Sequence, residues 1–131
     1  MNSRIKNVEN LSLHKRLGVG HIESADGKGR FTIPVTDEVL NPAGVLHGGV
    51  IYVLCDVCAY AGLLSILDDQ IEAVTHDFHI SIMRSVPHGA EVTFSSEIIK
   101  MGRRLCFIAV TVSMEGSTIA TAKVTKSLIQ Q

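Results

Sequence analysis

The sequence has little net charge and few cysteines, and both shortages exclude function classes. Its formal net charge at pH 7 is −1 over 131 residues, so no strongly basic surface is available to attract nucleic acid or an anionic membrane. Three scattered cysteines are too few for a disulfide framework, and the first 18 residues contain no apolar segment of a secretion signal. We therefore expect a cytoplasmic protein in the reduced state, without a nucleic-acid partner.

Common catalytic motifs are also missing. Ser65 and Ser95 lack the Gly-x-Ser-x-Gly surroundings of a hydrolase nucleophile. Cys55 and Cys58 have the Cys-x-x-Cys spacing of redox pairs, but they lie in an apolar stretch where inert, buried thiols are expected. Segment 76–79 holds two histidines and an aspartate, yet no further ligand stands at metal-binding spacing, so we predict no metal site.

The longest apolar run, residues 49–67, is interrupted at its centre by Asp56. Its length approaches that of a transmembrane helix, yet the aspartate, two glycines within the run and the amphipathic segments after it argue against a membrane span. A helix that is apolar on all sides is otherwise the central helix of a domain, covered on nearly every face. We therefore predict a buried helix over residues 48–67 and no membrane partner.

The rest of the chain shows helical spacing near its start and strand-like patterns elsewhere. Residues 1–17 are predicted to form an N-terminal helical segment, with an amphipathic helix at 3–16. The sequence Asp26–Gly29 is typical of a hairpin turn. The predicted strands cover residues 19–24, 30–35, 71–84, 90–101, 104–114 and 117–129. We expect one α+β domain, 1–131, in which an antiparallel sheet, its last four strands a meander, wraps the central helix.

Gly48 and Gly49 stand at the predicted start of the long helix. The first amide N–H groups of a helix have no partner within it and lie at the positive end of the helix dipole. Without side chains at these positions, a ligand oxygen can approach the N–H groups closely, which is the geometry of an oxyanion hole. The alternative explanation is that the glycines permit tight helix packing.

Asp56 is the unusual residue of this helix. A carboxylate among apolar residues is costly unless it is paired or functional, and pairing with a basic residue such as Arg84 is the structural alternative. The helix rises about 1.5 Å per residue, so Gly48 and Asp56 are about 12 Å apart along its axis. If both act on one carbonyl group, Asp56 must come from a second copy of the chain, with two sites per symmetric dimer.

The helix start and Asp56 belong to a longer pattern within about residues 30–128. That pattern comprises Asn41, Gly44, His47-Gly48-Gly49, Asp56, Ala73-Val74-Thr75 and the residues through Arg84. It resembles the hotdog-fold acyl-CoA thioesterases of the phenylacetate-degradation (PaaI-like) type. The resemblance implies a hotdog fold, with a curved antiparallel sheet around one long helix. It also implies homodimers with joined sheets, paired into homotetramers, which hydrolyse an acyl-CoA thioester at the dimer interface.

The resemblance implies a role for each residue of the pattern. Asp56 is the nucleophile or the base that activates water, and the Gly48 N–H polarises the thioester carbonyl. Asn41 and His47 orient the thioester and the helix start, while Thr75 positions water or Asp56. Because a thioester has a good thiolate leaving group, these groups suffice without a metal or a cofactor, and CoA enters only as part of the substrate.

The expected substrate contacts are Gly49, Arg84, Arg103 and Arg104. The last two stand with Lys100 at a predicted hairpin tip, where basic residues are usually solvated; alternatively they bind the CoA phosphates. Ser85 follows Arg84 where the family often has proline, which leaves the exit of this strand undefined.

Two other functions stay open at this point. Dehydratases or hydratases of the same fold rely on a histidine, a helix carboxylate and a Pro-rich loop, which residues 41–49 do not resemble. A non-catalytic acyl-CoA sensor would normally carry a DNA-binding element, and the chain has room only for the short N-terminal helix.

Overall fold

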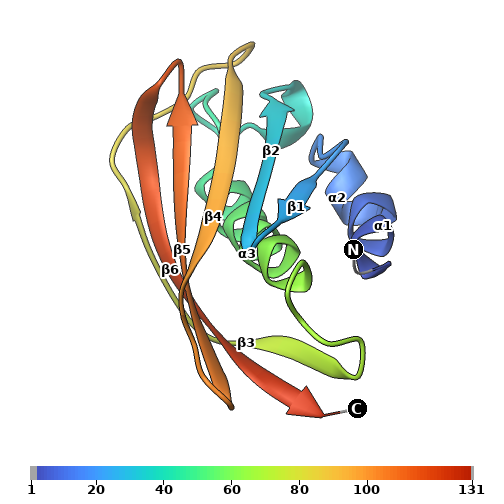
Figure 1. Ribbon diagram of the computed structural model, residues 1–131. Coiled ribbons are helices and arrows are strands. Elements are labelled where there is room, and N and C mark those ends of the chain that lie inside the picture. Colours follow the sequence, from blue (N-terminus) through green and yellow to red (C-terminus); the bar gives the residue numbers. More distant parts are fainter. Residues whose placement is uncertain (1–2, 131) are drawn as a thin grey trace.

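The computed structural model describes residues 3–130, which form one six-stranded antiparallel sheet around a long helix. The helices are α1 (Arg4–Asn10), α2 (Ser12–Arg16), the 3-10 helix η1 (Asp37–Val39) and α3 (Gly48–Leu64). The strands are β1 (Glu23–Ala25), β2 (Lys28–Pro34), β3 (Ile71–Ile82), β4 (Glu91–Met101), β5 (Leu105–Met114) and β6 (Ser117–Gln130). The sheet curves around α3, and α1 and α2 lie on the side away from β5 and β6 (Figure 1). This is the α+β architecture that the residue patterns predicted and the hotdog fold that the resemblance implied.

Helix α3 packs tightly against the sheet, chiefly on β2 and β4. Its side chains Leu54, Cys58 and Leu63 are fully buried. A Cβ on Gly62 would lie 2.7 Å from the backbone nitrogen of Gly29, so the helix and β2 approach each other too closely for a side chain. This contact fixes α3 across the sheet. No helix within residues 3–130 is both long and apolar enough to cross a membrane.

One turn of α3 is less covered than predicted. Tyr52 and Val53 are 46% and 36% exposed, so the expectation of a helix covered on nearly every face is wrong there. The reason is that the sheet of one chain wraps α3 from one side (Figure 1). Tyr52 stacks on Phe78 of β3, with ring centroids 5.2 Å apart.

The order of the strands is β1-β2-β4-β5-β6-β3. The predicted meander of the last four strands is therefore wrong for β3, which pairs with β6 at the edge of the sheet. Alternation of apolar residues reveals which face a strand buries but not which strand lies beside it. The connection from β3 to β4 crosses to β2: Leu46 donates to the Val86 carbonyl at 2.8 Å, and Val35 donates to the Ala90 carbonyl at 2.8 Å. This crossover runs past the start of α3.

The N-terminal region contains two short helices where one was predicted at 3–16. Leu11 is extended, with ψ of 131°, and separates α1 from α2. Leu11 and Leu13 are 52% and 49% exposed, so no continuous buried face holds a single helix together. Residues 1 and 2 of the predicted segment lie outside the described residues.

The predicted hairpin is present with a shorter turn. Asp26 and Gly27 have φ of 54° and 76°, the left-handed pair of a two-residue type I′ turn. Lys28 and Gly29, expected in the turn, therefore begin β2. The first strand spans three residues rather than 19–24.

Candidate active site

The start of α3 is shaped by two side chains of the loop that precedes this helix, Asn41 and His47. Asn41 closes the loop on itself, because its Oδ1 accepts hydrogen bonds from the N–H groups of Ala43 at 3.0 Å and Val45 at 3.2 Å. His47 caps the helix, because its Nδ1 accepts the Gly49 N–H at 2.8 Å. This bond requires an unprotonated Nδ1. Both residues thus act on the helix start through contacts within a few positions of the chain.

The two positions at the helix start, 48 and 49, are occupied by glycine for different structural reasons. A Cβ on Gly49 would lie 3.0 Å from the His47 Nδ1, so the cap itself leaves no room for a side chain. A Cβ on Gly48 would meet only the Cδ1 of Ile82, at 3.4 Å, so packing does not demand glycine there. The Gly48 N–H has no hydrogen-bond acceptor within residues 3–130. Packing therefore explains Gly49, whereas Gly48 leaves a free donor in the first turn of the helix.

A cleft of about 330 Å³ opens beside Gly48. Asn41, Ile82 and Arg84 line it together with Gly48, because the crossover between β3 and β4 brings Arg84 to the helix start. Arg84 and Asp56 do not line a common cleft, so the expected alternative of an Arg84–Asp56 pair is not what the structure contains. The structure places three of the predicted site residues, Asn41, Gly48 and Arg84, at one cleft.

Asp56 is bound by two side chains from the sheet. Its Oδ1 accepts hydrogen bonds from the Thr75 hydroxyl at 2.7 Å and from the Lys126 ammonium at 2.8 Å. Thr75 and Lys126 face each other directly across the β3–β6 pair, just before an irregularity in its register. Asp56 has 38% of its side chain exposed, whereas that of Lys126 is 3% exposed. The predicted proximity of Thr75 to Asp56 is present, with a buried cation added to it.

Lys126 is the residue that the sequence reasoning missed. It stands in β6 at an inward position of the alternation, since Ala122 and Val124 before it are also buried. A lysine at a core-facing position of a strand was the available signal, because an ammonium is almost never fully buried unless it is paired. Its partner was not readable, because 70 positions separate it from Asp56.

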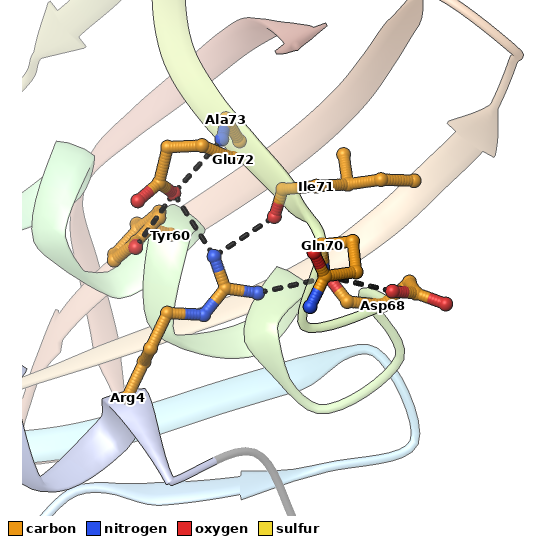
Figure 2. Close-up of polar contacts among 7 residues, drawn as sticks. All are labelled: Arg4, Tyr60, Asp68, Gln70, Ile71, Glu72 and Ala73. Carbon is orange, nitrogen blue, oxygen red and sulfur yellow. Dashed lines mark hydrogen bonds and ion pairs between the residues drawn. The ribbon is translucent and has the colours of Figure 1, made fainter. Parts of the chain in front are cut away.

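A second carboxylate, Glu72, lines the same cleft as Asp56. Figure 2 shows its polar contacts. The Oε1 of Glu72 accepts the Tyr60 hydroxyl at 2.8 Å and the Ala73 N–H at 2.9 Å, and it pairs with Arg4 at 3.3 Å. Burial alone would raise the pKa of Glu72, but these hydrogen bonds and the charges of Arg4 and Lys126 together hold it below its usual value. Burial, followed by the Glu72 carboxylate, raises the pKa of Tyr60 to about 12. The N-terminal helix is thus tied to the rim of the Asp56 site.

Within one chain, the predicted site residues Asp56 and Thr75 lie apart from those at the helix start. Asp56, Thr75, Lys126, Tyr60 and Glu72 line a second cleft of about 410 Å³, which shares no residue with the cleft at Gly48. Arg103 and Arg104 lie in the β4–β5 turn, exposed, and line neither cleft. Their turn is on the Asp56 side, because the Arg104 carbonyl accepts the Leu128 N–H at 2.8 Å and Leu128 pairs with Ala73 of this cleft.

The cysteines and histidines do not form a further site. Burial raises the pKa of the Cys55 thiol well above its usual value and that of Cys58 to about 12, so both thiols are protonated and unreactive. Nδ1 of His76 lies 3.2 Å from the Ser127 hydroxyl. No group of three or more His, Cys, Asp or Glu side chains in the described part of the chain is arranged to hold a metal ion.

Comparison with known proteins finds relatives both by sequence and by structure. Over 109 residues the chain is 28% identical to acyl-coenzyme A thioesterase 13 from Homo sapiens, which covers 82% of this chain and 77% of the human protein. A conserved protein from Pseudomonas aeruginosa has the same fold, with 22% identity, a TM-score of 0.88, and coverage of 95% of this chain and 98% of that one.

A hypothetical thioesterase from Streptococcus pneumoniae, solved with coenzyme A, has 25% identity, a TM-score of 0.78 and coverage of 85% and 86% of the two chains. Residues 43–121 of this chain match the thioesterase superfamily. This match contains the free donor at Gly48 and the carboxylate at Asp56, and it spans more than half of the 131 residues. The chain belongs to the thioesterase superfamily.

Proposed function

We propose that the protein is a single-domain acyl-CoA thioesterase, which hydrolyses an acyl- or aryl-CoA thioester to the free acid and CoA. The human relative is named for this activity and the streptococcal relative was solved with coenzyme A, which supports this substrate class. The observation that carries the proposal is the state of Asp56. Its Oδ1 is held by Thr75 and Lys126, while its Oδ2 has no hydrogen-bond partner within residues 3–130, and the side chain lines an open cleft.

In the general-base course, Oδ2 of Asp56 accepts a proton from water as the water oxygen attacks the thioester carbonyl carbon. The carbonyl electrons move to the oxygen, where the Gly48 N–H stabilises the negative charge. Collapse of this intermediate re-forms the carbonyl and expels the CoA thiolate, which takes up the proton from Asp56. In the nucleophilic course, Oδ2 itself attacks the carbonyl carbon and the C–S bond breaks, which expels the CoA thiolate and leaves a mixed anhydride of Asp56 and the acyl group. Water then hydrolyses this anhydride to the free acid and the Asp56 carboxylate, and the proton that the water releases passes to the thiolate.

The proposed site needs a second copy of the chain. Gly48 and Asp56 line separate clefts, and the helix rise separates them by about 12 Å. Strand β3 pairs on one side only within residues 3–130, which leaves twelve residues of open sheet edge carrying Val74 and Ile82, 44% and 43% exposed. An edge of this length is a template for strand pairing. We propose a homodimer joined along β3, with Gly48 of one protomer facing Asp56 of the other, and a homotetramer of two such dimers.

The remaining predicted residues bind and orient the substrate in this proposal. Asn41 and His47 hold the loop and helix start against which the thioester lies, and Arg84 contacts the substrate in the same cleft. Gly49 contributes through its missing side chain, because His47 already uses its N–H. Arg103 and Arg104 are exposed cations in the β4–β5 turn and are proposed to bind the CoA phosphates.

The test is hydrolysis of a panel of short, medium, long and aryl acyl-CoAs. The release of free CoA thiol measures the reaction. We expect hydrolysis of at least one acyl class and loss of it in Asp56→Asn. Acyl-CoA binding without thiol release would instead favour a sensor. Hydration of an enoyl thioester in a parallel assay would favour a hydratase.

A further inference from the structure

Lys126 contacts Asp56 but takes no part in the steps proposed above. Its Nζ lies 2.8 Å from Asp56 Oδ1 and 3.0 Å from Thr75 Oγ1, and the Thr75 hydroxyl donates to the same Oδ1 at 2.7 Å. Thr75 has one proton to donate, so it gives that proton to Asp56 and accepts one from the ammonium. The three side chains form a closed triangle that occupies Oδ1 and leaves Oδ2 unbonded within residues 3–130.

Stability alone does not explain a lysine at this position. Lys126 is 3% exposed and follows the buried Val124 on the inward face of β6. Removing an ammonium from water is costly, and well-packed apolar residues in place of buried charges are often neutral or stabilising. An apolar side chain would therefore fill the position at lower cost, which indicates that the charge has a use.

An aromatic ring and a second carboxylate surround the ammonium of this lysine. Its Nζ lies 5.5 Å from the centroid of the Tyr60 ring, whose face attracts a cation. Glu72 is a second carboxylate near Lys126, since the charge of Lys126 contributes to lowering the pKa of Glu72. The titratable groups around the pair are His14 of α2, Cys55 and Tyr60 of α3, Glu72 of β3 with Arg4 of α1 behind it, and Cys106 of β5.

We propose that Lys126 is a positioning residue of the thioesterase site: it keeps Asp56 ionised and holds Oδ1, so that Oδ2 is the oxygen presented to water or to the thioester carbonyl. This inference rests on the proposed function. A carboxylate flanked by apolar residues tends to stay protonated, and an ammonium at hydrogen-bond distance opposes that tendency. Thr75 assists by fixing the same oxygen.

The ammonium also affects the end of the catalytic cycle. When Oδ2 has taken up a proton, the Asp56 charge is gone and the buried Lys126 lacks its nearest counter-charge. This state is unfavourable, so the proton is driven off Asp56 and onto the departing thiolate. Lys126 thus weakens Asp56 as a base but returns it promptly to the ionised form.

The experiment compares the pH dependence of kcat/KM in wild type, Lys126→Met, Lys126→Gln and Lys126→Arg. Loss of the ammonium should move the acid-side midpoint of the profile upward by about 1–3 pH units in the Met and Gln variants. Lys126→Arg, which keeps the charge, should restore a midpoint close to that of wild type. Lys123→Met is the matched control, because Lys123 is an exposed lysine on the outer face of the same strand, and its midpoint should not move.

Two outcomes would overturn the inference. An unchanged acid midpoint in a folded Lys126→Gln or Lys126→Met variant, with activity reduced equally at all pH values, would make Lys126 purely structural. If Lys126→Arg does not restore the midpoint, the shift of the acid-side midpoint does not come from loss of the positive charge at position 126. Carboxyl-carbon NMR of Asp56, assigned with Asp56→Asn, provides a readout without substrate: Asp56 should titrate at higher pH in Lys126→Gln. If wild type hydrolyses no acyl-CoA, the proposed function fails, and this titration still decides whether Lys126 controls Asp56.

Discussion

The cleft at Gly48 and the cleft at Asp56 are built in opposite ways. At the helix start, the side-chain hydrogen bonds that shape the cleft join residues two or four positions apart. At Asp56, Thr75 and Lys126 reach the carboxylate across 19 and 70 positions. The capped helix start at the first cleft is thus built by one loop, with the β3–β4 crossover added as the other wall of the cleft. The Asp56 cluster exists only when α3, β3 and β6 are packed together in register.

This difference predicts different vulnerabilities. A slip of β6 by one residue relative to β3 would turn Lys126 to the outer face of the sheet and leave Asp56 without its cation. The helix cap at His47 would survive such a slip, because it depends on no strand. A change in strand packing far from either residue should therefore disturb the contacts of Asp56 before it disturbs the helix start at Gly48.

The largest effect on turnover is expected at the Asp56 cleft, whose side chains meet across long stretches of the chain. Asp56→Asn should lower turnover by about 10²–10⁴-fold, because an amide can neither accept the proton nor attack the carbonyl. It also leaves the buried ammonium of Lys126 without a carboxylate, so the free energy of unfolding should fall by about 1–3 kcal/mol.

The double variant Asp56→Asn with Lys126→Met separates these two consequences. It should recover most of the lost stability and none of the lost turnover, measured by urea unfolding and steady-state hydrolysis. Near-normal turnover in the single variant, with reduced stability, would make Asp56 only the structural partner of Lys126.

Gly48→Pro tests the local cleft in the same way. It removes the free N–H at a position where helices accept proline, and ψ of 130° at His47 suits a residue before proline. Turnover should fall by about 10²–10³-fold, the usual effect of losing an oxyanion donor. Gly48→Ala keeps the N–H and places a methyl group 3.4 Å from Ile82, so it is the control that should retain most of the activity.

Mixing the two damaged chains tests whether the clefts meet across a dimer. A mixed dimer of Asp56→Asn and Gly48→Pro chains has one site with both lesions and one with neither. Random reassortment of equal amounts should restore about a quarter of wild-type activity, because half the dimers are mixed and half their sites are intact. Two affinity tags isolate the mixed dimer. If it is stable and inactive, each chain builds its own site and the proposed arrangement is wrong.

A smaller effect is expected when only the helix cap is removed. His47→Ala loses the acceptor for the Gly49 N–H and should reduce the free energy of unfolding by about 0.5–2 kcal/mol. His47→Asn supplies another capping oxygen and should restore most of that loss. Thermal unfolding compares the two variants. Equal stability of both with wild type would show that the cap does not hold the helix start.

The smallest effect is expected outside both clefts. Replacing Arg103 and Arg104 together by alanine should raise KM for acyl-CoA by about 3–10-fold, because exposed cations bind phosphate weakly through solvent. The KM for short thioesters that lack the nucleotide should not change. Equal changes for both substrates would remove these arginines from the CoA site.

Much of the helix start was predictable from the sequence. The glycines after His47, the apolar stretch behind them and the single aspartate within it predicted a central helix with a donor at its start, and α3 begins at Gly48 as predicted. The sheet strands after residue 70 were predicted within a few residues of their observed bounds. Those features depend on periodicity and on contacts between neighbours in the chain.

The strand order and the partner of Asp56 were not predictable in this way. The alternation in β6 pointed Lys126 inward, but the only partner that the sequence suggested for Asp56 was Arg84, as a structural alternative, and Arg84 lies at the other cleft. The placement of β3 beside β6 decides this, because it sets Thr75 opposite Lys126.

The sequence by itself thus determined the long helix, its capped start and the free donor at Gly48, since the side-chain hydrogen bonds at the helix start span at most four positions. The tertiary structure alone decided which cation meets Asp56, which oxygen of that carboxylate stays free and which turn of α3 is left uncovered. These depend on how segments far apart in the chain pair and pack, and the free energy of that packing is a sum over the whole core rather than a property of any short stretch.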